Sequence, residues 1–382
     1  MNIMENNNVI NILDKLISFK SVTPFDDNCQ EYIANYLQEL GFDIQFKKYD
    51  DVTNLIARYG REKPVLAYVG HTDVVPTGDV KKWDTDPFKL TDKNSKLYGR
   101  GTSDMKGGIA CMLYSIREFL SNNKDTNGSI VVILTSDEEG SAVNGIKRLV
   151  ESGDLTPYEI DMCIVGEPSC KKVIGDTIKN GRRGSLSGKL RVQGIQGHIA
   201  YPQNAMNPIH AFSPVLNKLV SEKYDEGNEY FPPTSFQISN INSGVGTTNI
   251  IPGELNMDFN FRYSTETTKE ELQNKLEEIM NASGLDYTVS WSHSGDPFLT
   301  ERKDLLNACL TSVKDELNMI AEISTDGGTS DGRFMAKICD QVIEFGLINE
   351  SIHKINEHTT KSDLDAVTKV YKSMLKRLLS KQ

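Results

Sequence analysis

The chain has 382 residues, of which 38% are hydrophobic and 25% are charged, so it can form more than one folded core. Its 42 lysines and arginines against 53 aspartates and glutamates give a net charge of −11, which disfavours a nucleic-acid binder because such proteins usually carry a basic face. No apolar run reaches the ~18 residues of a membrane span, and residues 1–13 lack the basic and apolar regions of a signal peptide, so we predict neither.

Helical and strand patterns alternate along the first half of the chain and again near its end. Three stretches carry apolar residues at helical spacing: 9–17, 32–40 and 109–120. Four short, continuous apolar runs are typical of strands buried on both faces: 64–69, 130–134, 163–165 and 342–345. Buried strands separated by amphipathic helices predict an α/β domain with a mostly parallel, mixed sheet.

The pattern changes between residues 184 and 297. Alternating apolar residues predict four strands, and helical stripes predict two helices, in the order β-α-β-β-α-β. This order is that of a ferredoxin-like α+β domain. We therefore predict a larger α/β domain formed by residues 1–183 and 298–382, with a smaller domain, 184–297, inserted into it.

Polar clusters follow four of the predicted strands, and one opens the helix at 109–120. The clusters are Gly70–Asp73, Gly99–Gly108, Asp137–Gly140, Gly166–Pro168 and His353. Ligands of open α/β sheets bind at the carboxyl ends of the strands, so we expect these clusters to converge. They offer histidines and carboxylates, a donor set that suits zinc, cobalt or manganese. The six cysteines are scattered without a CxxC pair, which indicates reduced cytoplasmic thiols rather than disulfides or a zinc–thiolate site.

The same clusters carry a family resemblance. The segments 70–79, 97–108, 135–140 and 166–169 (GHTDVVPTGD, LYGRGTSDMKGG, TSDEEG and GEPS) resemble the M20 family of two-metal aminoacylases and peptidases. Five more segments narrow the resemblance to members that hydrolyse N-succinyl-LL-2,6-diaminopimelate: 179–188, 194–202, 228–238, 325–334 and 352–357. The resemblance implies a zinc-dependent amidohydrolase of lysine and diaminopimelate biosynthesis. It also implies a cytoplasmic homodimer in which the inserted domain serves as a dimerisation or lid domain.

Two zinc ions per subunit are implied by the resemblance, and cobalt or manganese can substitute for them. His71, Asp104 and Glu167 would hold one ion. Glu139 and His353 would hold the other together with Asp104, which would bridge the pair. Two cations about 3.5–4 Å apart need such a shared anionic ligand to offset their repulsion.

Three further residues are predicted to take part in catalysis. Asp73 shares one face of an extended segment with His71, so its carboxylate can orient the imidazole. As a hypothesis, Glu138 takes a proton from the attacking water and passes it to the leaving amine. The resemblance implies that His198 reaches the active site of the neighbouring subunit and donates to the oxyanion.

Substrate binding requires cationic and amide groups, because the substrate carries three carboxylates and one ammonium. Arginine can bind a carboxylate through two parallel hydrogen bonds. The resemblance implies a pocket lined by Arg182, Ser185, Tyr201, Asn249, Arg262, Gly328, Thr329 and Asn349, with Asn249 acting across the dimer. Asp326 departs from the family pattern, and its carboxylate would repel an anionic substrate unless it points away.

Two alternative functions remain open at this point. The metal motifs fit an acetylornithine deacetylase or a dipeptidase equally well, whereas 179–185 and 228–238 favour the succinyl substrate. A protein that kept the fold could also bind a ligand without catalysis. All five proposed ligands and Glu138 are present, which disfavours that second alternative.

Overall fold

The computed structural model describes residues 8–123, 126–301 and 303–381, and these form two compact units. The first unit contains the chain up to Gly181 together with Leu299–Ser324 and the residues from Ser330 onwards. The second unit contains Arg182–Phe298 and Thr325–Thr329. Residues 1–7, on which the prediction about a signal peptide largely depends, lie outside the described residues. Among the described residues, none of the helices combines the length and the apolar character that crossing a membrane requires.

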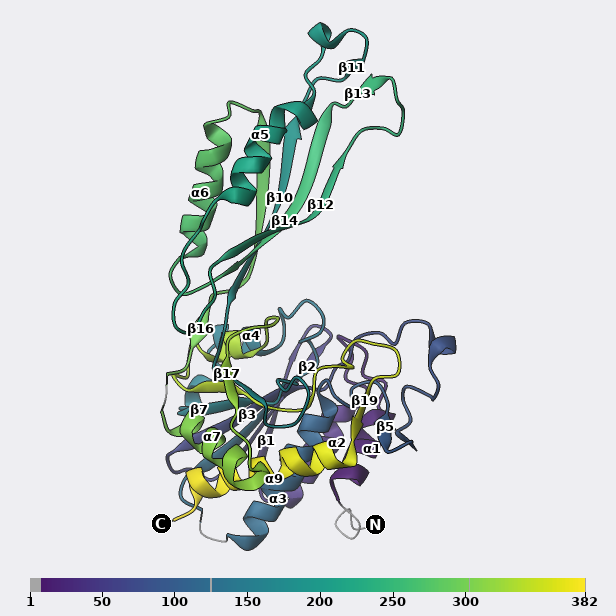
Figure 1. The fold of residues 1–382 in the computed structure, drawn as a ribbon. Helices are drawn as coiled ribbons and strands as arrows, with labels where there is room; N and C mark the ends of the chain where they lie inside the picture. The colour runs from purple at the N-terminus through teal and green to yellow at the C-terminus, as the bar shows by residue number, and fades with distance from the viewer. Residues whose placement is uncertain (1–7, 124–125, 302, 382) are drawn as a thin grey trace. The chain divides into compact units, whose positions relative to one another are not determined.

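An eight-stranded mixed sheet forms the centre of the first unit (Figure 1). Its strands, in spatial order, are β1 (Asp43–Tyr49), β2 (Val52–Tyr59), β6 (Ser129–Thr135), β3 (Val65–His71), β7 (Met162–Val165), β18 (Val342–Glu344), β8 (Thr177–Lys179) and β17 (Glu322–Ser324). Strands β6, β3, β7 and β18 are mutually parallel, so their carboxyl ends meet at one edge. This confirms the predicted α/β class with a mixed sheet.

Five helices contribute to a hydrophobic core on one face of this sheet: α1 (Val9–Ser18), α2 (Cys29–Glu39), α3 (Lys106–Asn122), α7 (Asp304–Leu317) and α9 (Lys361–Leu379). Their apolar stripes meet the side chains of one strand face, as Leu66 and Tyr68 of β3 illustrate. Two shorter helices, α4 (Ile146–Glu151) and α8 (Gly332–Met335), pack against each other, and α8 contacts β18. Local sequence sets the helix ends: the Asn8 side chain caps α1, and Gly41, with a φ of +90°, follows α2.

Short elements complete the first unit and form two of the passages between the units. They are β4 (Thr91–Lys93), β5 (Lys96–Tyr98), β19 (His358–Thr360), η2 (Val80–Lys82), η3 (Thr156–Tyr158), β9 (Gly181–Arg182) and β16 (Phe298–Leu299). Strands β19, β5 and β4 form a small antiparallel sheet. The chain passes from one unit to the other within β9 and again within β16. It also enters the second unit after Ser324 and leaves it before Ser330.

The second unit has a four-stranded antiparallel sheet and two helices, α5 (Pro208–Ser221) and α6 (Lys269–Asn281), on one face (Figure 1). The strand order is β12 (Ser235–Ser243), β14 (Glu254–Tyr263), β10 (Gly184–Gln193) and β15 (Tyr287–Gly295). The chain order β10-α5-β12-β14-α6-β15 confirms the predicted ferredoxin-like insertion. Shorter segments, β11 (Gly197–His198), η4 (Pro202–Asn204) and β13 (Ile250–Ile251), extend beyond the sheet.

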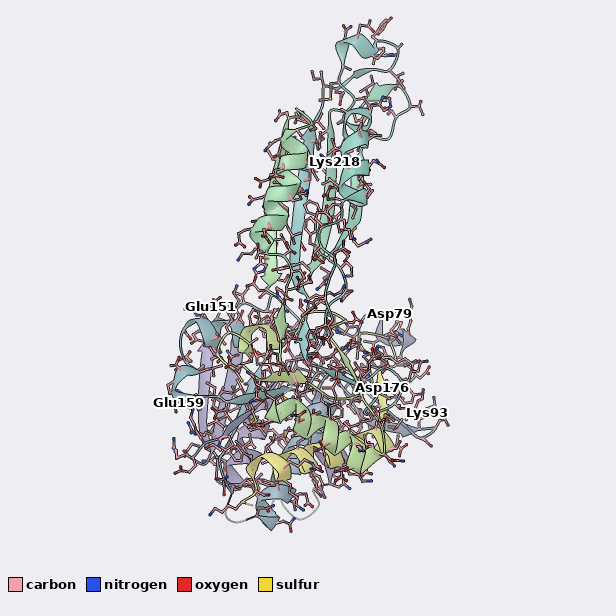
Figure 2. The ribbon with its side chains drawn as sticks, turned by 60° about the vertical axis from the view of Figure 1, so that its left-hand side comes forward. Asp79, Lys93, Glu151, Glu159, Asp176 and Lys218 are labelled. Atoms are coloured by element: carbon pink, nitrogen blue, oxygen red, sulfur yellow. The ribbon has the colours of Figure 1, made fainter. Side chains whose placement is uncertain are left out.

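Charged side chains stand on the outer surface of each unit (Figure 2). Glu151 and Glu159 of the first unit and Lys218 on α5 are examples, and all three are exposed. The six cysteines, in contrast, are all buried, and all are free thiols. Charged groups thus lie mainly at the surface, while apolar side chains pack around the strands whose ends carry the polar clusters.

Candidate metal centre

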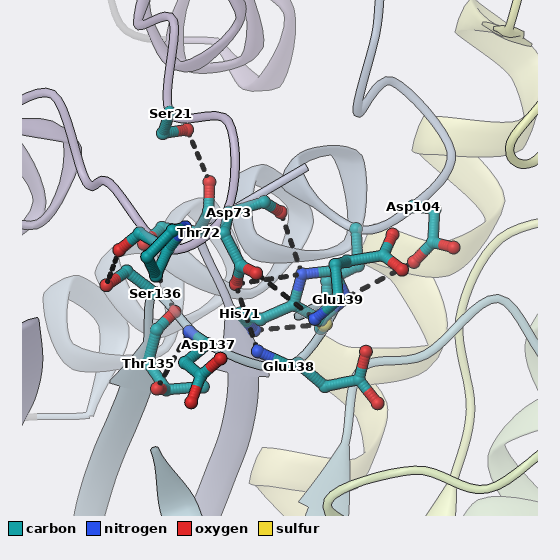
Figure 3. Close-up of polar contacts among 12 residues, drawn as sticks. Ser21, His71, Thr72, Asp73, Asp104, Thr135, Ser136, Asp137, Glu138 and Glu139 are labelled. Atoms are coloured by element: carbon teal, nitrogen blue, oxygen red, sulfur yellow. Dashed lines mark hydrogen bonds and ion pairs between the residues drawn. The ribbon is translucent and has the colours of Figure 1, made fainter. Parts of the chain in front are cut away.

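The five predicted metal ligands come from separate segments at the carboxyl edge of the central sheet. His71 is the last residue of β3, Glu139 follows β6, and Glu167 follows β7. Asp104 lies two residues before the start of α3, and His353 lies in the connection between β18 and β19. Figure 3 shows His71, Asp104 and Glu139 in one cluster. Parallel strands thus bring together residues that lie as many as 282 positions apart, from His71 to His353.

The two carboxylate oxygens of Asp104 face different histidines. Oδ1 of Asp104 lies 3.3 Å from Nε2 of His71, and Oδ2 lies 3.3 Å from Nε2 of His353. Each histidine also has a second carboxylate partner. Nε2 of His71 lies 3.7 Å from Oε1 of Glu167, and Nε2 of His353 lies 2.9 Å from Oε1 of Glu139. The arrangement is two imidazole–carboxylate pairs that share Asp104.

The donor atoms of this cluster fit a metal ion. Neither Nε2 of His71 nor Oδ1 of Asp104 makes a hydrogen bond among the described residues, and their side chains are only 1% and 8% exposed. A buried polar atom without a partner is costly, and a cation between these two atoms would satisfy both. Ligand atoms of His71, Asp104 and Glu139 lie within 4.8 Å of one another, as do those of His71, Glu138 and Glu167. Nitrogen and oxygen donors at such spacing suit zinc, cobalt or manganese.

Histidines and carboxylates in this cluster perturb one another's ionisation. Burial lowers the pKa of His71, but the carboxylates of Asp104, Glu167 and Asp73 outweigh it and hold that pKa well above its usual range. Hydrogen bonding to Asp104 and Glu139 raises the pKa of His353 to about 10. Burial opposes ionisation of Asp104, yet both histidines hold its pKa below the usual range. Metal binding needs neutral imidazoles, so a bound cation would take the place of these protons.

The environment of Glu138 disfavours its ionised form. Burial raises the pKa of Glu138 well above its usual range, His71 opposes that shift, and the charges of Asp331 and Glu139 add to it. A carboxyl group with a raised pKa beside a candidate metal centre is a candidate to accept and return a proton. Glu139, the adjacent residue, is instead directed at His353. The two neighbouring glutamates therefore have different surroundings.

Asp73 contacts His71 and the segment after β6 through different atoms. The acceptor nearest to Nδ1 of His71 is the backbone oxygen of Asp73, at 2.9 Å, whereas its carboxylate Oδ1 lies 3.6 Å away. The carboxylate instead accepts the backbone amides of Glu138, at 3.3 Å, and Glu139, at 3.1 Å (Figure 3). Asp73 thus contacts the His71 ring through its main chain, and the backbone amides of Glu138 and Glu139 through its side chain.

Most of the predicted substrate-binding residues belong to the second unit. Ser185 on β10 and Arg262 on β14 are cross-strand partners, and Asn260 Nδ2 donates to Ser185 Oγ at 3.1 Å. Arg182 Nη1 donates to the backbone oxygen of Asp326 at 2.8 Å, so this arginine contacts the segment that also contains Gly328 and Thr329. Asn349 belongs to the first unit, where its backbone amide donates to Cys170.

His198, Tyr201 and Asn249 are brought together at the β11–β13 pair. The rings of His198 and Tyr201 lie 5.6 Å apart between centroids. The backbone amide of Ile199 donates to the backbone oxygen of Asn249 at 3.1 Å. The side chains of His198 and Tyr201 are exposed, so this tip presents polar and aromatic groups to its surroundings.

Three residues to which the sequence analysis assigned no role lie close to the cluster. Glu357 accepts hydrogen bonds from the side chain of Arg100 and from the backbone of the segment that ends in Asp104. Asp331 is 2% exposed, neither of its carboxylate oxygens has a hydrogen-bond partner among the described residues, and burial raises its pKa to about 7. The sequence contains only weak indications that these three residues lie near the cluster. Glu357 follows His353 by four residues, and Arg100 and Asp331 lie inside the glycine-rich segments already noted.

Comparisons with known proteins identify one family and relatives that share one name. The profile of peptidase family M20/M25/M40 matches residues 67–377. A protein from Nitrosospira multiformis named succinyl-diaminopimelate desuccinylase is 50% identical, covering 98% of this chain and 99% of its own. An Acinetobacter baumannii protein of the same name is 48% identical, and the match covers 99% of this chain and 100% of the Acinetobacter protein.

Solved structures share the fold at low sequence identity. An M20 metallo-carboxypeptidase from Sulfolobus solfataricus has a TM-score of 0.82 at 17% identity, covering 98% of this chain and 99% of its own. A dinuclear metal-binding M20 peptidase from Bacillus subtilis has a TM-score of 0.70 at 17% identity, covering 96% of each chain. These likenesses concern the fold alone.

Proposed function

Because this chain belongs to peptidase family M20/M25/M40, we propose that it is a two-metal amide hydrolase acting on N-succinyl-LL-2,6-diaminopimelate. Its products would be succinate and LL-2,6-diaminopimelate, an intermediate of lysine and diaminopimelate biosynthesis. The name of relatives that are about half identical over nearly their whole length supports the substrate. The observation that carries the chemistry is the pair of Asp104 oxygens, each 3.3 Å from a different histidine.

The five ligand residues would hold two metal ions. His71, Asp104 and Glu167 would bind one ion, and Glu139 and His353 would bind the other, with Asp104 shared. We propose zinc as the native metal, with cobalt or manganese able to replace it, because the donors are nitrogen and oxygen. Bound ions of this kind acidify a coordinated water and polarise the substrate carbonyl.

The residues of the chain itself would move the proton and hold the geometry. Glu138 accepts a proton from the attacking water while the water oxygen bonds to the succinyl carbonyl carbon. The carbon–nitrogen bond then breaks, and Glu138 returns the proton to the leaving amine nitrogen. Asp73 keeps Glu138 and Glu139 in place through their backbone amides.

The second unit would supply substrate recognition and a partner surface. Arg182 and Arg262 would bind substrate carboxylates, and Ser185, Tyr201, Gly328, Thr329 and Asn349 would complete the pocket. We propose that residues 184–297 act as a dimerisation or lid domain in a homodimer. His198 and Asn249 would then serve the active site of the other subunit. A cytoplasmic location fits the six free thiols.

Turnover and metal content, measured on one purified sample, test this proposal. We expect about two equivalents of metal per chain and release of succinate from N-succinyl-LL-2,6-diaminopimelate. A chelator should abolish turnover, and added zinc, cobalt or manganese should restore it. N-acetylornithine and a dipeptide are the comparison substrates. If either comparison substrate is turned over faster than N-succinyl-LL-2,6-diaminopimelate, the protein is instead a deacetylase or a dipeptidase. Full metal content without turnover of any substrate would favour a binding protein.

A further inference from the structure

Glu357 places its carboxylate against four donors from one segment. Oε2 accepts Nη1 of Arg100 at 2.7 Å and the backbone amide of Gly101 at 3.0 Å. Oε1 accepts the backbone amides of Ser103, at 2.9 Å, and Asp104, at 3.0 Å. The donors all lie within residues 100–104, which end in the residue shared by both halves of the metal centre. Hydrogen bonds to a charged acceptor are about twice as strong as neutral ones.

This contact joins two segments that carry proposed ligands. Glu357 lies four residues after His353 and directly precedes β19, which pairs with β5. Its backbone oxygen also accepts the amide of Gly99 at 3.1 Å. The segment that bears His353 is therefore fastened, through both the main chain and the side chain of Glu357, to the segment that bears Asp104.

Burial strengthens the electrostatic interaction between Glu357 and Arg100. Glu357 is 0% exposed and Arg100 is 2% exposed, so solvent does not screen the pair. Arg100 is held in turn by the Trp83 ring, 5.2 Å from the guanidinium carbon, and by the backbone oxygen of Pro76. Both carboxylate oxygens are used, so a group with a single acceptor oxygen could not replace this carboxylate without loss.

We propose that Glu357 is a positioning residue for the metal centre, because it fixes the backbone at Asp104 so that the two oxygens of Asp104 face the two histidines. It does not touch a metal ion or the substrate. The inference rests on the proposed ligand set and not on the proposed substrate. Partners that orient metal ligands typically change metal affinity about 10–100-fold when they are removed.

Cobalt binding tests this role without any substrate. The metal-free full-length protein is titrated with Co²⁺, and the visible absorption of the bound ion reports both affinity and ligand geometry. In Glu357→Gln an amide NH₂ would confront backbone N–H donors, so we expect Co²⁺ to bind about 10–100-fold more weakly, with an altered spectrum. An unchanged spectrum with an affinity within twofold of the wild type would overturn the proposal.

A matched control separates positioning from general stability. Asp161 also accepts a backbone amide, that of Val65 at 2.8 Å, and pairs with Lys63, but it lies at the opposite end of β3. Asp161→Asn should lower the melting temperature and leave Co²⁺ binding unchanged. If Asp161→Asn weakens Co²⁺ binding as much as Glu357→Gln does, the effect belongs to stability and the proposal fails.

A second variant covers the case in which Glu357→Gln does not fold. Glu357→Asp keeps the charge opposite Arg100 but is one methylene shorter, so it cannot reach the amides of Gly101 and Asp104 together. We expect weaker Co²⁺ binding than in the wild type, and wild-type binding would overturn the proposal. A protein that binds Co²⁺ normally, and yet never releases succinate, would refute the proposed substrate without affecting this inference.

Discussion

The carboxylate of Asp73 accepts the backbone amide of Glu139 at 3.1 Å, so a residue two positions after one proposed ligand holds the segment that carries another. Its other oxygen accepts the amide of Glu138 at 3.3 Å. Asp73 is 0% exposed, and its backbone oxygen is the nearest acceptor to Nδ1 of His71. One residue therefore links the end of β3 to the loop after β6.

Asp73→Asn should impair both metal binding and turnover. An asparagine side chain has a single acceptor oxygen, so its NH₂ group would face one of the two backbone amides. We expect kcat/KM and metal affinity each to fall about 10–100-fold, measured by steady-state kinetics and metal titration. Asp176→Asn is the control, because Asp176 accepts the backbone amides of residues 171–173 outside the centre. Equal losses in both variants would contradict a specific role for Asp73.

Glu138→Gln should separate metal binding from proton transfer. Glutamine keeps the size of the side chain but cannot accept a proton, so we expect kcat to fall about 10²–10⁴-fold while metal content stays near that of the wild type. Kinetics and metal analysis of the same sample measure both quantities. Glu139→Gln is the comparison, and it should lose metal, because Glu139 lies 2.9 Å from His353. Activity of Glu138→Gln within a few-fold of the wild type would make the base assignment wrong.

The sequence predicted those strands and helices whose apolar residues form a continuous run or a helical stripe. Strand β3 was predicted from a continuous apolar run, and the ends of such runs pointed to His71 and Glu167. Strand β1 was not predicted, because its residues are all exposed or half-buried and carry no continuous apolar run. Helices α7 and α9 were not predicted either, although both bury apolar residues.

The parts of the site that could not be predicted from the sequence depend on the path of the backbone and on contacts between distant segments. Glu357 accepts the amide of Asp104 from 253 positions away, and no local pattern records a side chain that bonds to a backbone. The main-chain contact between Asp73 and His71 was missed for a related reason: spacing showed that the two residues share a face, but not which oxygen is nearer. Such details depend on the path of the backbone rather than on residue type.

Gly327→Ala should weaken substrate binding through Arg182. The φ of Gly327 is +107°, and an added Cβ would lie 2.4 Å from Nη1 of Arg182. The guanidinium would have to move, so we expect KM to rise about tenfold or more, with a smaller change in kcat, since a hydrogen bond to a charged group contributes about 1.5–3 kcal/mol. Gly284→Ala controls for strain, because its φ is +67° and nothing lies within 4 Å of the added Cβ. An unchanged KM in Gly327→Ala would count against Arg182 as a substrate ligand.

Asp154→Asn should change how stability depends on pH. Burial opposes ionisation of Asp154, but Lys47, at 2.8 Å, and the hydroxyls of Tyr49 and Ser152 lower its pKa from 3.8 to about 2. A carboxyl group with a lowered pKa stabilises the fold above its unfolded value of about 4, and the contribution is lost as pH falls towards 2. The melting temperature of the wild type should therefore exceed that of the variant at pH 7, and the difference should shrink between pH 4 and pH 2.5. Asp43→Asn, which removes an exposed pair with Arg61, serves as the control. A difference independent of pH would contradict this assignment.

Mixing two inactive variants should restore activity if His198 acts across a dimer. His353→Ala removes a proposed ligand and His198→Ala removes the proposed oxyanion donor, so each homodimer should be inactive. In a mixed dimer the intact metal centre of the His198→Ala chain receives His198 from the other chain. Random exchange of equal amounts should give about a quarter of the wild-type number of working sites, because half of the dimers are mixed and each has one complete site. Differently tagged chains verify the exchange. If exchange is verified and activity stays absent, His198 serves its own subunit and the arrangement across the dimer is wrong.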